Sequence, residues 1–340
     1  MKMTIAAILC LPAIMCLPSQ QVCKAELLEM TLSQDSIYTP GKIKLALRLT
    51  DMAIYNERYQ FRLGIYMAGE LVRKQTLTAT QGKSVLFELA FPEVFSRTEG
   101  RCRCELFIGQ DFFESQEKPF TLWPQIEPYP EQKIKKKEIW TFDTSGKLQE
   151  LFDKMEVKVT DATFQPAREF GSPDIVFVGQ CIDPNSMRLV TDRLETVEPE
   201  PVIIYLKQKQ FLKESKLEIP AENNRPQSFI CDVNSILLSG LGMVDIMKMV
   251  EDTSFIKVKK DGNSGRTIKS YVTEDKKDEK NIYSYLFAER HWGKNSVYCQ
   301  LPIYDGDDPR GAILLKNILN HAVEFIDSRE NQINSDNERK

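Results

Sequence analysis

The chain has 340 residues, of which 42% are hydrophobic and 28% are charged, and its formal net charge is −4. This composition is typical of a globular protein and excludes an intrinsically disordered one, and the length predicts about two domains. The chain has only two histidines, His291 and His321, which excludes a metal centre built from several histidines.

Residues 1–25 have the pattern of a secretory signal peptide. Lys2 gives a short positive start, an apolar run covers 3–17, and the small residue Ala25 offers a site for signal peptidase. We therefore predict cleavage after Ala25 and a secreted or periplasmic protein. A lipoprotein signal is the alternative, but no small residue directly precedes Cys10, Cys16 or Cys23. The apolar run is short for a membrane span, and no later stretch predicts a transmembrane segment.

The mature chain would carry 43 basic and 49 acidic residues, a net charge of −6. A mildly acidic protein has no electrostatic attraction to nucleic acid or to anionic membranes, so neither is an expected partner. Five cysteines would remain, and an odd number cannot all pair within one chain. Cys102 and Cys104 alternate onto the apolar face of a predicted strand, where we interpret them as small buried side chains.

Residues 26–122 alternate between apolar and polar side chains with a period of two. The alternation is clearest at 43–49, 59–65 and 85–89, and glycine or proline marks the turns between these segments. Short strands at regular spacing predict an antiparallel β-sandwich of the immunoglobulin or fibronectin type. The Cys–Trp–Cys pattern of antibody domains is absent, so the prediction concerns the architecture alone.

Residues 123–137 form a Pro- and Lys-rich segment that predicts a domain boundary. Three prolines lie between 124 and 130, and four lysines lie between 133 and 137. A basic binding patch is one interpretation of the lysines. Because Glu131 and Glu138 flank them, a solvated linker is the better one.

From 138 to 327 the pattern changes to alternating strands and helices. Strands are predicted at 138–142, 156–160, 173–178, 201–206, 283–288 and 296–301, and helices at 146–155, 184–197 and 308–325. This order predicts an α/β domain with a doubly wound, mostly parallel sheet of the flavodoxin-like type, covered by helices on both faces. Residues 328–340 are polar, and we expect a frayed tail.

This second domain resembles the class I glutamine amidotransferase-like domains, in particular those fused to β-sandwiches in large secreted bacterial proteins and some glycoside hydrolases. The segments that carry the resemblance are 173–179, 202–208, 289–302 and 308–319, with a looser match at 234–241. The resemblance implies a cysteine nucleophile on a tight turn after strand 202–206, paired with a histidine.

The residues of such a site are missing from these positions. The turn that follows Leu206 contains neither cysteine nor glycine. Cys181 follows the preceding strand, with one glycine on one side, and an ordinary loop thiol is the better interpretation. We interpret His291 as a turn residue and place His321 near the exposed end of the last helix. We therefore expect a degenerate domain with no catalytic residue, no cofactor and no metal.

Ligands of α/β folds bind at the carboxyl ends of parallel strands. This rule places Gln180, Cys181, Gln208, Gln210 and Asp305 at one edge, where side-chain amides suit a neutral polar ligand better than proton transfer. We expect alanine at Gln208 or Asp305 to weaken such a ligand and to leave the fold intact.

The acidic group at 305–308 admits a second interpretation. Its carboxylates could hold calcium, but Asp308 followed by Pro309 is typical of a helix N-cap and first helical residue. We favour capping.

The sequence thus predicts a secreted, non-catalytic binding or scaffolding protein, which the resemblance places near extracellular carbohydrate. Its partner would be a polysaccharide or another extracellular protein, and nothing indicates an oligomeric state. The alternative is a hydrolase of extracellular glycans that uses carboxylates such as Asp183 or Asp305, which would have to converge within about 5–9.5 Å.

Overall fold

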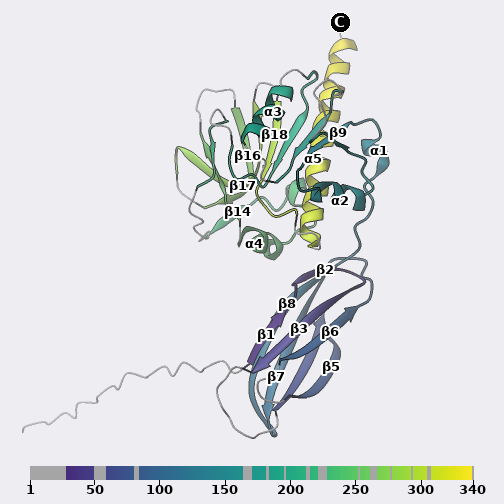
Figure 1. Cartoon of the computed structure of the whole chain (residues 1–340), viewed down its shortest axis with the longest axis vertical. Coiled ribbons are helices and arrows are strands. Elements are labelled where there is room, and N and C mark those ends of the chain that lie inside the picture. The colour runs from purple at the N-terminus through teal and green to yellow at the C-terminus, as the bar shows by residue number, and fades with distance from the viewer. Residues whose placement is uncertain are drawn as a thin grey trace, which may run out of the picture.

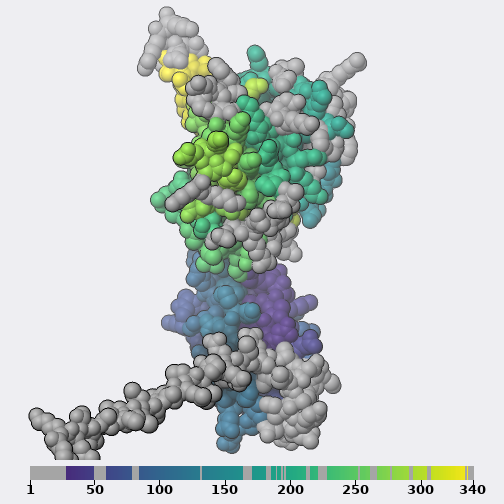
Figure 2. Space-filling view, turned by 90° about the vertical axis from the view of Figure 1, so that its left-hand side faces the viewer, coloured from purple at the N-terminus to yellow at the C-terminus, as the bar shows by residue number. Residues whose placement is uncertain are grey.

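The computed structural model describes residues 28–49, 59–79, 84–163, 171–180, 184–194, 197–211, 215–220, 228–251, 253–260, 266–275, 278–291, 294–304 and 308–338. The protein is mostly β, with several sheets and some α/β character. Two units are stacked along its long axis: an all-β unit, purple to blue in Figures 1 and 2, and an α/β unit, teal to yellow.

The first unit is built from two sheets. One has three strands in the order β1 (Leu28–Leu32), β3 (Gly41–Leu49) and β6 (Val85–Phe91). The other has five in the order β2 (Ser36–Tyr38), β8 (Asp111–Trp123), β7 (Thr98–Ile108), β4 (Tyr59–Met67) and β5 (Glu70–Ala79). All pairs are antiparallel except β2 with β8.

The core of the first unit lies between these sheets. Alternate residues of β3, such as Ile43 and Leu45, and of β4, such as Phe61 and Leu63, point into one apolar cluster. A strand sends successive side chains to opposite faces, so the period of two in the sequence becomes one buried face on each sheet. Cys102 and Cys104 belong to this cluster as fully buried side chains, and both thiols are free.

The second unit contains one ten-stranded sheet. Its main path runs through β10 (Thr160–Asp161), β9 (Ile139–Phe142), β11 (Ile175–Val178), β12 (Val202–Leu206), β18 (Lys294–Cys299), β17 (Asn281–His291), β15 (Ile256–Lys259) and β13 (Leu217–Glu218). A branch adds β16 (Arg266–Glu274) beside β17 and β14 (Phe229–Cys231) beside β16.

This sheet has a parallel half and an antiparallel half. The pairs from β10 to β18 are parallel. Every pair from β18 through β17 to β13, and along the branch to β14, is antiparallel. The predicted mostly parallel sheet is therefore present in one half only, because strands between 217 and 274 that the sequence analysis did not identify extend it antiparallel.

Helices cover both faces of the large sheet. One face packs against α2 (Lys147–Lys154), the 3₁₀ turn η3 (Ile236–Leu238), α4 (Met243–Glu251) and α5 (Pro309–Glu338). On the other face, α3 (Pro184–Leu194) covers the parallel half. Helix α5 begins beside β2 of the first unit and leads away from it (Figure 1). The predicted frayed tail at 328–340 is instead helical to Glu338, since α5 continues well beyond its apolar part.

The segment between the units is attached to the second one. It contains the short helix α1 (Glu131–Ile134), and Tyr129 donates a 2.8 Å hydrogen bond from its hydroxyl to Asn320 on α5. Lys137 forms ion pairs with Asp327 and Glu330, also on α5. The other lysines of this segment are exposed, as expected for solvated side chains.

Candidate functional site

The carboxyl ends of β9, β11, β12 and β18 lie along one edge of the sheet because these strands run parallel in register. Immediately beyond these ends stand Asp143, Gly179, Lys207 and Gln300. Lys207 has a left-handed backbone with a φ of 44°, which turns the chain sharply at the end of β12. This edge is where the sequence placed the ligand-binding residues.

Gln208 links three of the strand ends. Its side-chain Nε2 donates to the backbone oxygen of Gly179 at 2.5 Å and to that of Leu206 at 2.8 Å. The backbone oxygen of Gln208 accepts a 2.9 Å bond from Gln300 Nε2. The residue is only 3% exposed, and its Oε1 has no hydrogen-bond partner. These bonds indicate a structural role for Gln208, which would make alanine at this position destabilising; its binding of a ligand stays a prediction.

Asp143 holds the next strand end in the same way. Its carboxylate accepts bonds from the backbone N–H and hydroxyl of Ser145 and from the backbone N–H of Leu148 at 2.9 Å. The bond to Leu148 satisfies a buried backbone donor in the first turn of α2, and those to Ser145 fix the exposed turn that precedes the helix. Gly179 leaves room for this carboxylate, since a Cβ there would lie 2.7 Å from the Cβ of Asp143.

The remaining predicted site residues are not shown to converge. Gln180 is half-buried after β11, and Gln210 is exposed beyond Gln208. Cys181 and Asp305, as well as Asp183 of the hydrolase alternative, lie outside the residues that the structure describes. Asp308 accepts a 3.0 Å bond from the backbone N–H of Arg310, which confirms its predicted role as a helix cap.

The described thiols are in their unreactive, protonated form. Burial raises the pKa of Cys102, Cys104 and Cys299 to about 12 each, and that of Cys231 to about 11. A thiolate, not a thiol, is the nucleophile and the metal ligand. Burial also lowers the pKa of His321. Within the described ranges, no three His, Cys, Asp or Glu side chains are grouped so as to hold a metal ion.

A different feature stands out on α4. Its inward side chains Ile246, Met249 and Val250 are buried. Its outer side chains Met243, Val244 and Met247 are 46%, 56% and 53% exposed. We refer to these three residues as the α4 outer face.

A surface helix usually carries polar residues on its outer side, and exposed apolar groups beside one another often mark binding surfaces. The sequence analysis missed this face. The composition of 243–250, which is apolar at nearly every position, could have indicated it.

None of the described helices combines the length and the apolar character that crossing a membrane requires. No protein-family model and no curated protein matches the chain.

Among solved structures, domains d3–d4 of the rat CD45 extracellular region are 13% identical over 28% of this chain and 46% of theirs, with a TM-score of 0.19. The periplasmic chaperone SfaE is 13% identical over 33% of this chain and 66% of its own, with a TM-score of 0.23. A β-glucuronidase of Parabacteroides merdae is 9% identical over 55% of this chain and 31% of its own, with a TM-score of 0.23. The chain spans less than two thirds of each of these, and likenesses this weak assign neither a fold nor a function.

Proposed function

We propose that this chain is a secreted, non-catalytic scaffolding protein that binds another extracellular protein through the α4 outer face. The main support is that Met243, Val244 and Met247 are exposed side by side on one helix. Burying them against a partner would remove apolar surface from water at about 25 cal/mol per Å². Methionine is well suited to this role because its flexible side chain adapts to different partners.

The chemistry of this face favours a protein over a polysaccharide. Sugars are held by hydrogen bonds to their hydroxyl groups and by contacts with flat aromatic rings, and the α4 outer face offers neither. Its aliphatic and thioether groups suit the apolar side of a helix or strand in the partner. The association with carbohydrate that the resemblance implies would then be indirect, through the partner.

We further propose that the second unit is a degenerate relative of the amidotransferase-like domains, and that its parallel half is the doubly wound part. Support comes from the parallel order of β9, β11, β12 and β18 and from the left-handed backbone of Lys207 directly after β12. That is the position at which the family carries its nucleophile. A lysine there, and described thiols that are all protonated, support a binding role over catalysis.

The test uses the secreted chain with a photo-crosslinking residue at position 247. We expect a discrete adduct with one extracellular protein of the native host. Once that protein is identified and purified, its affinity for the unlabelled chain can be measured by calorimetry. Met247→Lys should weaken binding at least about tenfold, or about 1.4 kcal/mol, with no change in thermal unfolding.

Ile333→Lys is the matched control, because Ile333 is also 53% exposed and lies on a different helix, α5. It should leave the affinity unchanged. An adduct of two copies of this chain would contradict the proposed partner. So would glycan-array binding that persists unchanged in Met247→Lys.

Secretion has its own test. N-terminal sequencing of protein recovered from the native host should begin near Glu26, whereas an intact Met1 on cytoplasmic protein would contradict export.

A further inference from the structure

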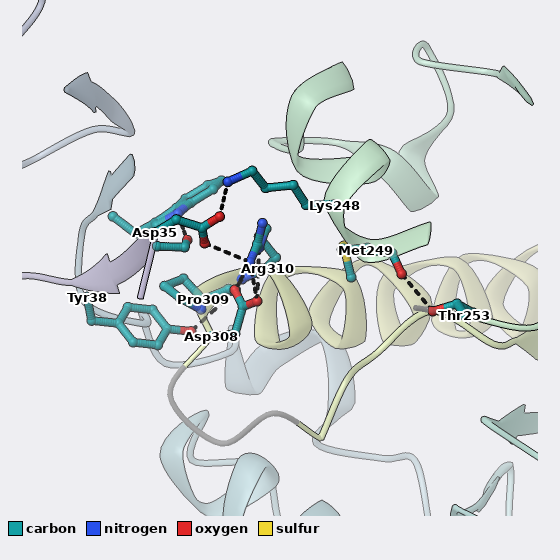
Figure 3. Close-up of polar contacts among 10 residues, drawn as sticks. Asp35, Tyr38, Lys248, Met249, Thr253, Asp308, Pro309 and Arg310 are labelled. Atoms are coloured by element: carbon teal, nitrogen blue, oxygen red, sulfur yellow. Dashed lines mark hydrogen bonds and ion pairs between the residues drawn. The ribbon is translucent and has the colours of Figure 1, made fainter. Parts of the chain in front are cut away.

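The two units meet at a joint that contains a small group of charged side chains. Asp35 lies in the turn between β1 and β2 of the first unit. Its carboxylate pairs with Lys248 of α4 and, at 3.2 Å, with Arg310 at the start of α5. Figure 3 shows Asp35 between these two cations, one from α4 and one from α5. One anion of the first unit thus bridges two separate helices of the other.

The two cations disfavour each other. Burial, followed by repulsion from Arg310, lowers the pKa of Lys248, and the carboxylates of Glu251 and Asp308 offset part of that effect. Arg310 also pairs with Asp308 on its own helix at 2.7 Å. Replacing the Asp35 carboxylate by an amide would remove the ion pair of Lys248 and one of the two ion pairs of Arg310, whose side chain is only 11% exposed.

Other contacts across the joint are both apolar and polar. Trp123 at the end of β8 is buried in the apolar cluster of the second unit, and Tyr38 of β2 packs against the same cluster. Tyr38 donates a 3.4 Å hydrogen bond from its hydroxyl to the carbonyl of Pro309. On another part of the joint, Arg97 pairs with the buried carboxylate of Asp245 at 2.9 Å. A single polar contact between units is weak, and Asp35 differs from the others because it forms two ion pairs at once.

We propose that Asp35 is an electrostatic latch that holds the two units in a single arrangement, and that its loss allows them to move relative to each other. The latch works because one carboxylate of the first unit attracts two cations of the second unit across the joint. The movement would occur about the segment between Trp123 and Tyr129, which joins β8 to the second unit. Neither unit needs to unfold, since each has its own apolar core.

The test measures the distance between the units in the whole secreted chain. Spin labels attached through encoded ketone residues at the exposed positions 74 and 158 place one label on each unit. We expect a narrow distance distribution for the unaltered protein and a broad one for Asp35→Asn. Asp111→Asn is the matched control: it removes an exposed carboxylate from the first unit, at the start of β8, and should leave the distribution narrow.

A second variant tests the same ion pairs from the side of the second unit. Lys248→Met removes one of the two partners of Asp35 and should broaden the distribution less than Asp35→Asn, which removes both ion pairs. Should Asp35→Asn fail to fold, the unaltered protein is measured in about 1 M salt instead. The Debye length is then about 3 Å, so the same ion pairs are weakened and the distance distribution should broaden. The latch is ruled out by a distribution that stays narrow in both Asp35→Asn and high salt, or by one that is already broad in the unaltered protein.

Discussion

The parallel and antiparallel halves of the large sheet bury polar groups in different places. In the parallel half the described strands bury no charged side chain, and the buried polar side chains Asp143, Gln208 and Gln300 stand just beyond the strand ends. In the antiparallel half, buried polar residues lie within the strands, as Ser284 and Glu289 do in β17. Glu289 is satisfied there by a two-point ion pair with Arg266 of the neighbouring β16, one contact of which measures 2.9 Å.

The difference follows from how each half is covered. A parallel strand between two helical layers has no face for a charge, so polar groups collect where the backbone leaves the sheet and needs hydrogen bonds. An antiparallel strand beside other long strands can place a charge next to an opposite charge on its neighbour. The parallel half should therefore depend on apolar packing, and the antiparallel half on a small number of paired polar groups.

Removing a large apolar side chain from the parallel half should have the greatest effect. Phe177 of β11 is fully buried and contacts Phe152 of α2 edge to face, with 5.0 Å between ring centroids. We expect Phe177→Ala to lower the free energy of unfolding by about 3–5 kcal/mol, because it leaves a cavity between the sheet and α2. Urea unfolding followed by circular dichroism measures this loss. A loss below about 1 kcal/mol would show that this half does not depend on its packing.

Breaking the ion pair should be the largest single polar effect in the antiparallel half. Glu289→Gln leaves the Arg266 guanidinium, whose side chain is 6% exposed, without its charged partner. We expect a loss of about 3 kcal/mol in the free energy of unfolding. The double variant Arg266→Met with Glu289→Leu should recover most of it, since two apolar groups no longer need to be paired. If the double variant is as unstable as the single one, charge pairing is not the reason.

Gln208→Ala should cost less, about 1–3 kcal/mol, because it leaves backbone carbonyls at the ends of β11 and β12 without a donor. Gln210→Ala, at the exposed position two residues on, should leave thermal unfolding unchanged. Equal stability of both variants and the unaltered protein would return Gln208 to the role of a ligand-binding residue.

The smallest expected effect is a pH dependence of the free energy of unfolding, caused by His321, which packs against the antiparallel half. His321 on α5 contacts the ring of Tyr271 on β16, and burial lowers its pKa below the usual 6.5. The carboxylate of Glu324 offsets part of this effect, and the positive charge of Lys269 adds to it. The unfolded chain therefore binds this proton more readily than the folded one. The contribution of His321 to stability is complete above pH 6.5 and is lost as the pH falls below it.

Urea unfolding at about pH 7.5 and pH 5 should show this loss in the unaltered protein and a smaller one in His321→Gln. An identical pH dependence in both would assign the effect to other groups.

For the candidate site, local sequence patterns predicted where the strand ends lie but not what the individual side chains do there. The strand ends around Gln180 and Gln208 were located because short apolar strands followed by polar residues are a local pattern. That Gln208 turns inward depends on Gly179 and Gln300, which are distant in sequence. Asp143 was overlooked because its partners at Ser145 and Leu148 depend on how α2 turns back toward the end of β9. The α4 outer face was overlooked because its exposure depends on what packs nearby.

By itself, the sequence determined the elements whose pattern is local: the alternating strands of the first unit, the apolar strands of the parallel half and the capped start of α5. Only the tertiary structure decided how residues 217–274 extend the large sheet, since pairing between distant strands leaves little trace in any one of them. It also decided that Arg266 meets Glu289 and that Asp35 meets Lys248 and Arg310. A charged residue has the same appearance in a sequence whether it ends in water or beside its partner, because the pairing is a property of two distant positions brought together by the fold.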